Sequence, residues 1–113
     1  MNLPPGTTLY IGPPANPLLP ELQAKIAYAI SGVPGITEAH LPQCYSKGLV
    51  DPSAQILVLV LKPGVTPSNV MPQIQENMRT ALRGTGKFID IFPLAPNHPM
   101  LPIVRQTNTK LVI

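Results

Sequence analysis

The 113-residue sequence has few of the residues that mark disulfide-bonded and nucleic-acid-binding proteins. It contains one cysteine, Cys44, so no disulfide can form within the chain. It has no tryptophan, three tyrosines and two phenylalanines, and its eight basic residues are spread along the sequence. Proteins that bind nucleic acids usually combine a focused basic surface with aromatic side chains that stack on bases. The composition therefore predicts no nucleic-acid partner.

Charged residues are also scarce, at 12% of the chain against 44% apolar residues. Disordered chains show low hydrophobicity and high net charge, so we expect one folded domain over residues 1–113. Its tail, residues 96–113, is expected to be irregular or to hold a short extra element. The longest apolar run, at residues 56–61, is far shorter than the roughly 20 residues that cross a membrane, and no secretion signal is recognisable. These features predict a cytoplasmic protein without a membrane partner.

Sixteen prolines divide the sequence into short segments, as is typical of turns and helix ends. Residues 7–12 (TTLYIG) predict a short strand that the flanking prolines confine to an edge or end of a sheet. Asn16 and Pro17 predict the start of a first helix, and Gly32 its end. The apolar stripe of this helix, at spacings of three and four, consists of Leu19, Leu22, Ile26, Ala29, Ile30 and Val33.

Two extended segments follow the first helix. Residues 36–45 alternate in polarity, which places Glu38 and His40 on one face and Ala39 on the other. Residues 54–62 are apolar at successive positions, which predicts a strand that is covered on both faces at the centre of a sheet. The two segments are close enough in sequence to pair as a hairpin with a long loop.

A second helix and a last strand complete the pattern. The possible caps of the helix are Thr66, Ser68 and Asn69. Pro72 favours Asn69, because a proline in the first turn has no N–H bond to lose. The apolar face of the helix consists of Val70, Ile74, Met78, Ala81 and Leu82. Residues 88–94 then alternate as a strand, with Ile91 facing one way and Asp90 the other.

The resulting order is strand–helix–strand–strand–helix–strand. This order predicts an α+β fold with two layers, in which two helices cover one face of an antiparallel sheet. The ferredoxin-like arrangement fits it best. An open sheet with another strand order is the alternative.

His40 and Cys44 are the first candidates for a chemical site. Pro42 lies between them and disfavours a helix, on which they would share one face. On a strand they are about 13 Å apart. Zinc needs ligands at about 2.0–2.3 Å, and a thiol needs its base at about 3 Å. We therefore expect no metal, no cofactor and no catalytic residues.

The five carboxylates do not form a spaced catalytic pair. Asp90 is unusual because it interrupts the apolar strand FIDIF. It either faces solvent at an edge or acts as a site acid with a shifted pKa. Glu38, His40 and Asp90 could meet on the open face of the expected sheet. They are the candidate ligand or interaction residues.

Several stretches of the chain resemble a known family. PPGTTLYIGPPANP, the helix opening LPEL, and VPGITEAHLPQC are similar to the C-terminal domain of the enhanced serine sensitivity (SseB) family. The resemblance extends over roughly residues 4–95 and concerns packing positions. It implies an α+β fold, carries over no catalytic residue, and through the family's associations implies a link to type III secretion. His40 stands where that family usually has an aromatic residue.

The sequence thus favours a non-enzymatic protein-interaction module of a bacterial cytoplasm, with a partner protein or a second copy of itself as its target. The reason is a complete apolar pattern without a catalytic constellation. The first alternative is a small-molecule sensor, for amino acids such as serine, or a small enzyme. The second is a protein associated with a secretion system.

Overall fold

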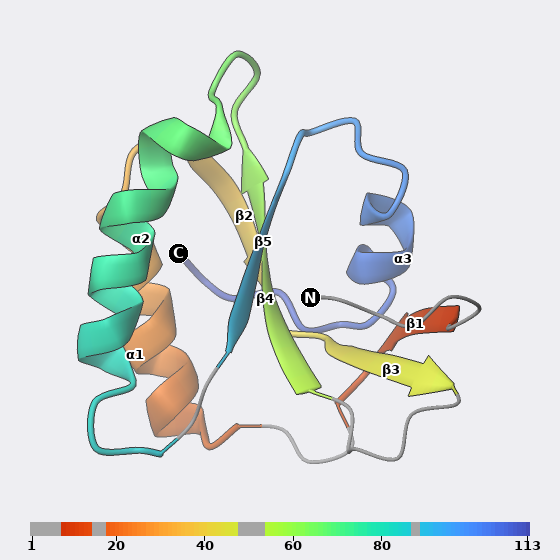
Figure 1. Ribbon diagram of the computed structural model, residues 1–113, viewed down its shortest axis with the longest axis horizontal. Helices are drawn as coiled ribbons and strands as arrows, with labels where there is room; N and C mark the ends of the chain where they lie inside the picture. The colour runs from red at the N-terminus through yellow and green to blue at the C-terminus, as the bar shows by residue number, and fades with distance from the viewer. Residues whose placement is uncertain (1–7, 15–17, 48–53, 87–88) are drawn as a thin grey trace.

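The computed structural model describes residues 8–14, 18–47, 54–86 and 89–113, and it has an α+β fold (Figure 1). Its elements in chain order are β1 (Thr8–Gly12), α1 (Pro20–Ser31), β2 (Ile36–His40), β3 (Gln43–Lys47), β4 (Ala54–Leu61), α2 (Pro67–Ala81), β5 (Asp90–Leu94) and α3 (Leu101–Arg105). The predicted class is therefore confirmed. None of the described helices is long and apolar enough to span a membrane.

Strand β4 is the centre of the sheet. It pairs with β2 in antiparallel fashion, His40 opposite Val58, and with β5 in parallel fashion, Phe92 opposite Val58. The sheet is therefore mixed, and the prediction of an antiparallel sheet was wrong, because the crossover through α2 brings the chain back parallel to β4. The hairpin predicted for residues 36–45 and 54–62 is confirmed by these pairings.

The first strand lies elsewhere than the ferredoxin-like order requires. In that order the first strand separates the third from the fourth, whereas here β5 pairs directly with β4 and β1 pairs with β3. The ferredoxin-like order is not confirmed. Leu41 and Pro42 interrupt the expected strand and divide it into β2 and β3. Beyond this break β3 diverges from β2 and carries β1 away from the central sheet (Figure 1).

The two faces of β4 belong to different clusters. Leu57, Leu59 and Leu61 lie in the larger core together with residues of α1 and α2, which pack side by side on one face (Figure 1). Ile56 and Val58 lie in a smaller cluster on the other face, together with Val104 of α3. All of these β4 side chains are at most 3% exposed. The prediction that this strand is covered on both faces is confirmed.

Both long helices begin at a proline that the sequence analysis did not select. Helix α1 begins at Pro20, and Asn16 and Pro17, where its start was predicted, lie outside the described residues. Leu19, expected in the apolar stripe, is 67% exposed. Helix α2 begins at Pro67 with Thr66 at its N-cap, so the choice of Asn69 was wrong. A proline at the first helical position removes an N–H that has no partner within the helix, which favours both starts.

The C-terminal tail covers the outer edge of β2. The N–H of Leu41 donates to the carbonyl of Thr109 at 3.1 Å, and the N–H of Leu111 donates to the carbonyl of Ala39 at 2.7 Å. His40 and Lys110 form an isolated antiparallel bridge between these bonds. The tail therefore satisfies backbone groups that would otherwise be exposed along this edge.

Three glycines test how strongly the turns of this fold restrict the backbone. Gly35 has a φ of +96°, and an added Cβ would lie 3.2 Å from Cγ1 of Val65. Gly64 has a φ of +83° with open space around it, while Gly32 has neither a positive φ nor a close neighbour. We expect Gly35→Ala to lower the free energy of unfolding by about 1.5 kcal/mol and Gly64→Ala by about 1 kcal/mol.

Gly32→Ala is the matched control, and it should leave the protein unchanged or slightly more stable. Urea unfolding of the three variants measures the order of their stabilities. Equal stability of Gly32→Ala and Gly35→Ala would contradict the turn described here.

Candidate functional site

Glu38 and His40 lie two residues apart on β2 and therefore project from the same face of the sheet. Nε2 of His40 is 3.1 Å from Oε1 of Glu38. Arg105, the last residue of α3, binds the same carboxylate at two points: its Nη2 donates to Oε2 at 2.6 Å and its Nε donates to Oε1 at 3.2 Å. A guanidinium held by both oxygens of a carboxylate is a strong and directional ion pair.

The ion pair determines the charge of Glu38. Hydrogen bonds from Arg105 are the main cause that lowers the pKa of Glu38 from 4.5 to about 2, against burial, which raises it. The hydrogen bond to His40 lowers it further. The same contact raises the pKa of Arg105. Glu38 is therefore ionised at neutral pH and has no proton to give, so Nε2–H of His40 is the donor in their hydrogen bond.

The side chains of this arrangement bind one another. Both carboxylate oxygens of Glu38 are occupied by Arg105, and His40 is 2% exposed. The remaining ring nitrogen of His40, Nδ1, is buried and has no hydrogen-bond partner among the residues that the structure describes. The group joins α3 to the edge of the central sheet, and we call Glu38, His40 and Arg105 the β2–α3 latch. Its geometry is suited to holding two elements together.

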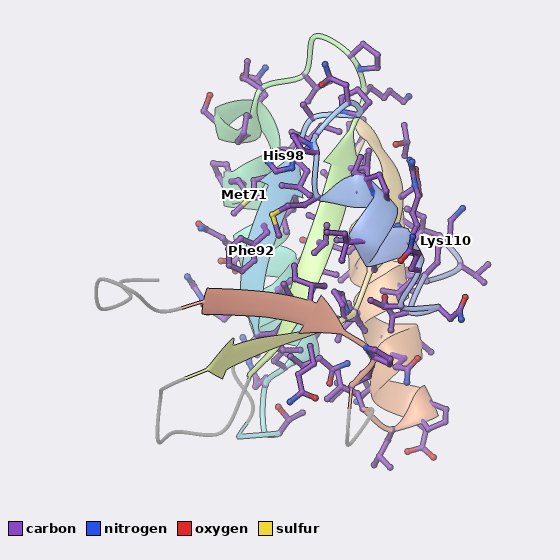
Figure 2. All side chains as sticks on the ribbon, turned by 90° about the vertical axis from the view of Figure 1, so that its right-hand side faces the viewer. Met71, Phe92, His98 and Lys110 are labelled. Atoms are coloured by element: carbon purple, nitrogen blue, oxygen red, sulfur yellow. The ribbon has the colours of Figure 1, made fainter. Side chains whose placement is uncertain are left out.

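Asp90 shares the face of the latch but stands apart from it. It pairs with Ile56 at one edge of β4, while His40 pairs with Val58 at the other edge, so about 10 Å of sheet separates them. Figure 2 looks onto this face, with α3 in front of β4 and Phe92 on the β5 side. No hydrogen bond or ion pair joins Asp90 to the latch among the described residues. The structure thus brings two of the three candidate residues together.

His40 and Cys44 lie on different strands, on either side of the break at Leu41 and Pro42. The side chain of Cys44 is outside the described part of the structure, so the pair itself is not placed. Within the described part, no group of three or more histidine, cysteine, aspartate or glutamate side chains could hold a metal ion.

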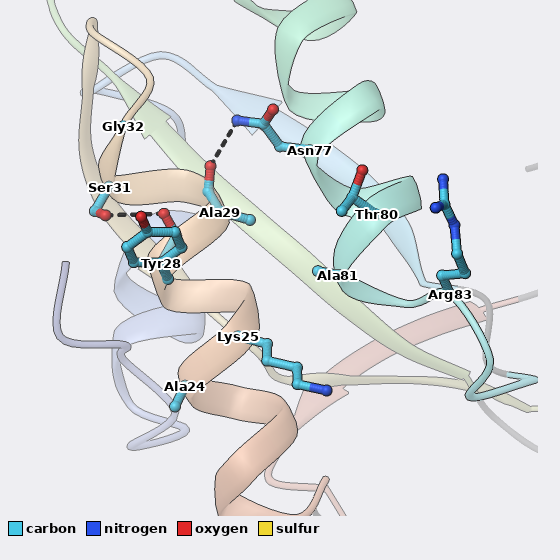
Figure 3. Close-up of a pocket in the computed structure, with 10 residues that line it drawn as sticks. All are labelled: Ala24, Lys25, Tyr28, Ala29, Ser31, Gly32, Asn77, Thr80, Ala81 and Arg83. Carbon is cyan, nitrogen blue, oxygen red and sulfur yellow. Dashed lines mark hydrogen bonds between the residues drawn. The ribbon is translucent and has the colours of Figure 1, made fainter.

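A groove on the opposite side of the molecule lies between the outer faces of α1 and α2 (Figure 3). Its volume is about 770 Å³, which falls in the range of sites that accept ligands or partner segments. The two helices are tied across it by Asn77, whose Nδ2 donates to the carbonyl of Ala29 at 2.9 Å. Gln73 in turn donates to Oδ1 of Asn77 at 2.7 Å, so the amide is fixed in place.

A second groove, of about 520 Å³, lies between α1 and the C-terminal tail. The two grooves share Ala24, Tyr28 and Ser31, so α1 forms the ridge between them. Tyr28 on this ridge is 84% exposed. We call the residues that dominate the ridge and its two flanks the α1 surface: Ala24, Lys25, Tyr28, Arg83, Lys110 and Val112.

The α1 surface is basic and partly apolar. Lys25 and Arg83 line the first groove and Lys110 lines the second, and no aspartate or glutamate of the described residues lines either one. Val112 is 93% exposed. Exposed apolar side chains that are grouped around a concave surface mark interaction sites more often than isolated ones do.

The sequence analysis missed both the latch partner and this surface. Arg105 is separated from Glu38 by 67 residues, so no local spacing relates them. The α1 surface did leave a signal, because Tyr28 falls outside the apolar stripe of its helix. An aromatic side chain on the solvent face of an amphipathic helix is unusual enough to have been singled out.

Comparisons of the chain with protein-family models, with curated proteins and with solved structures find no match. The resemblance to the SseB family therefore stays a prediction from the sequence.

Proposed function

We propose that the protein is an interaction module that binds a partner protein through the α1 surface and works by recognition rather than by catalysis. The observation that carries the proposal is the position of Tyr28, which is 84% exposed on a ridge between two grooves. Tyrosine offers a large contact area at a small cost in conformational entropy and is enriched in interfaces.

The β2–α3 latch lies on the other side of the molecule, and it also favours recognition over catalysis. A general acid or base must reach its substrate within hydrogen-bonding distance. His40 is buried, and Glu38 is already bound by Arg105. A small-molecule site formed by Glu38, His40 and Asp90 would need this latch to open, and neither groove includes any of the three. The sensor alternative has less support than the interaction module.

The partner that we propose is a different protein. A symmetric dimer through the α1 surface would place the same patch of both copies in contact. The interface would then contain Lys25, Arg83 and Lys110 of both copies, and like charges gathered in one interface are costly. A homodimer, as the sequence analysis considered, would have to use another surface.

Selection from a random peptide library displayed on phage tests the proposal. We expect selected peptides to bind the native protein, as measured by fluorescence anisotropy, and Ala24→Trp to weaken that binding at least about tenfold. Ala24 is exposed and lines both grooves, so the larger side chain obstructs them without entering the core.

The matched control is Gln75→Trp, an exposed position on α2 that lines neither groove and should leave affinity unchanged. A library that yields no binder, or peptides that bind Ala24→Trp as tightly as the native protein, would contradict the proposal.

A further inference from the structure

We infer, resting on the proposed function, that the segment bound by the α1 surface is an amphipathic helix with carboxylates at both margins of its apolar face. The acids would lie against Lys25 and Arg83 in the first groove and against Lys110 in the second. The apolar face would cover Tyr28. The inference names the chemistry of the partner, which the proposed function leaves open.

The first reason is the pattern of ion pairs on the described surface. Arg79 pairs with Glu76, and Arg105 pairs with Glu38. Within the part of the chain that the structure describes, no ion pair is made by Lys25, Lys62, Arg83 or Lys110. All of these except Lys62 line the two grooves, and no described aspartate or glutamate lines either groove. A partner that brings carboxylates would supply the missing counter-charges.

The second reason is the position of the cations. Figure 3 shows Lys25 extending from α1 toward the C-terminal end of α2, where Arg83 lies beyond the last turn. Lys110 lies in the groove on the other flank of α1. The positive charges therefore border the tyrosine ridge on both sides. A segment that crosses the ridge would be matched by acids on its two margins and apolar side chains between them.

The third reason is that a helix fits here better than an extended strand does. A strand binds by adding to a free sheet edge, through main-chain hydrogen bonds. The walls of the first groove are two helices, and the backbone groups within those helices already bond to one another. A helix needs no such bonds, because its side-chain ridges pack into the groove that neighbouring helices leave.

A nucleic acid would also be attracted by three cations, but the surface does not favour it. Binding of single strands relies on several aromatic side chains along a basic path. Among the side chains that the structure describes, Tyr28 is the one aromatic that lines either groove. Val112, at 93% exposure, and Ile113, at 41%, add apolar area that a phosphate backbone would leave uncovered. The composition of the surface is that of a protein interface with a basic rim.

The peptides selected on the native protein test the inference. We expect aspartate and glutamate to be enriched in them over the starting library, at positions that flank apolar residues spaced three and four apart. Lys25→Glu and Arg83→Glu should each weaken binding about tenfold, and raising salt from 0.05 M to 0.5 M should weaken it further. Lys62→Glu, an exposed position that lines neither groove, makes the same charge change and should leave affinity nearly unchanged.

The outcomes separate the inference from the proposed function. Peptides that lose binding in Ala24→Trp but show no acidic enrichment and tolerate Lys25→Glu and Arg83→Glu would overturn the inference and leave the interaction module standing. Peptides that Ala24→Trp does not affect would overturn both. A 12-nucleotide single strand that displaces the peptides and loses binding in Lys25→Glu would overturn the inference in favour of a nucleic acid. Thermal unfolding should show that every charge variant is folded, because all three positions are exposed.

Discussion

Leu59→Ala is expected to lower the free energy of unfolding by about 3–4 kcal/mol. Leu59 is fully buried on the central strand, and its side chain lies in the core shared with α1 and α2. Truncation removes its buried methyl groups and leaves a cavity that β4 cannot collapse, because β2 and β5 hold that strand on both sides. Urea unfolding followed by circular dichroism measures the loss.

The matched control is the same change at Leu19, which is 67% exposed at the start of α1. Leu19→Ala should change stability by no more than about 0.5 kcal/mol. If the two variants were equally stable, Leu59 could not occupy the position described here. The comparison also bears on the α1 surface, because that surface is rigid only while this core holds both helices against the sheet.

The core could be predicted from the sequence because its signals are local. Successive apolar residues at 56–61 indicated a strand covered on both faces, and both faces are covered. Spacings of three and four placed Leu22, Ile26 and Ile30 on the buried side of α1. Periodicity of this kind depends only on the geometry of the element itself.

Helix starts and strand order were harder to predict, because the sequence allows more than one helix start and more than one strand partner. Each long helix has more than one proline near its beginning, and every such proline fits a first turn. Pro42 was used only as an argument against a helix, whereas the structure shows that it and Leu41 divide the extended segment into β2 and β3. Strand β1 pairs with β3 beyond that break, and the sequence contains no local sign of which partner it takes.

The candidate site, too, was predictable only where its sequence signal is local. The alternation of residues 36–40 predicted that Glu38 and His40 share a face, and the structure places them 3.1 Å apart. The element that covers this face is α3, which comes from a proline-rich tail without a clear helical period. The face expected to be open is therefore closed by Arg105. Its role depends on tertiary packing, which spacing along the chain does not encode.

Glu38→Gln is expected to remove about 2 kcal/mol of stability at pH 7, because it replaces a charge-assisted pair of hydrogen bonds by a neutral one. The pKa of Glu38 falls from 4.5 to about 2 on folding, which would correspond to about 3 kcal/mol at 1.36 kcal/mol per unit. The expected value is smaller because Arg105 is half exposed, and solvent screens the pair.

The sign of the pH dependence follows from the lowered pKa. The folded state holds Glu38 ionised more strongly than the unfolded state does, so its contribution is complete above about pH 5 and is lost as pH falls from 4.5 toward 2. The stability difference between the native protein and Glu38→Gln should therefore shrink to near zero at pH 2. Glu76→Gln is the control, because Glu76 pairs with Arg79 on an exposed surface and should contribute at most about 0.5 kcal/mol. A stability difference for Glu38→Gln that stays constant from pH 7 to pH 2 would show that the ionised carboxylate of Glu38 does not stabilise the latch.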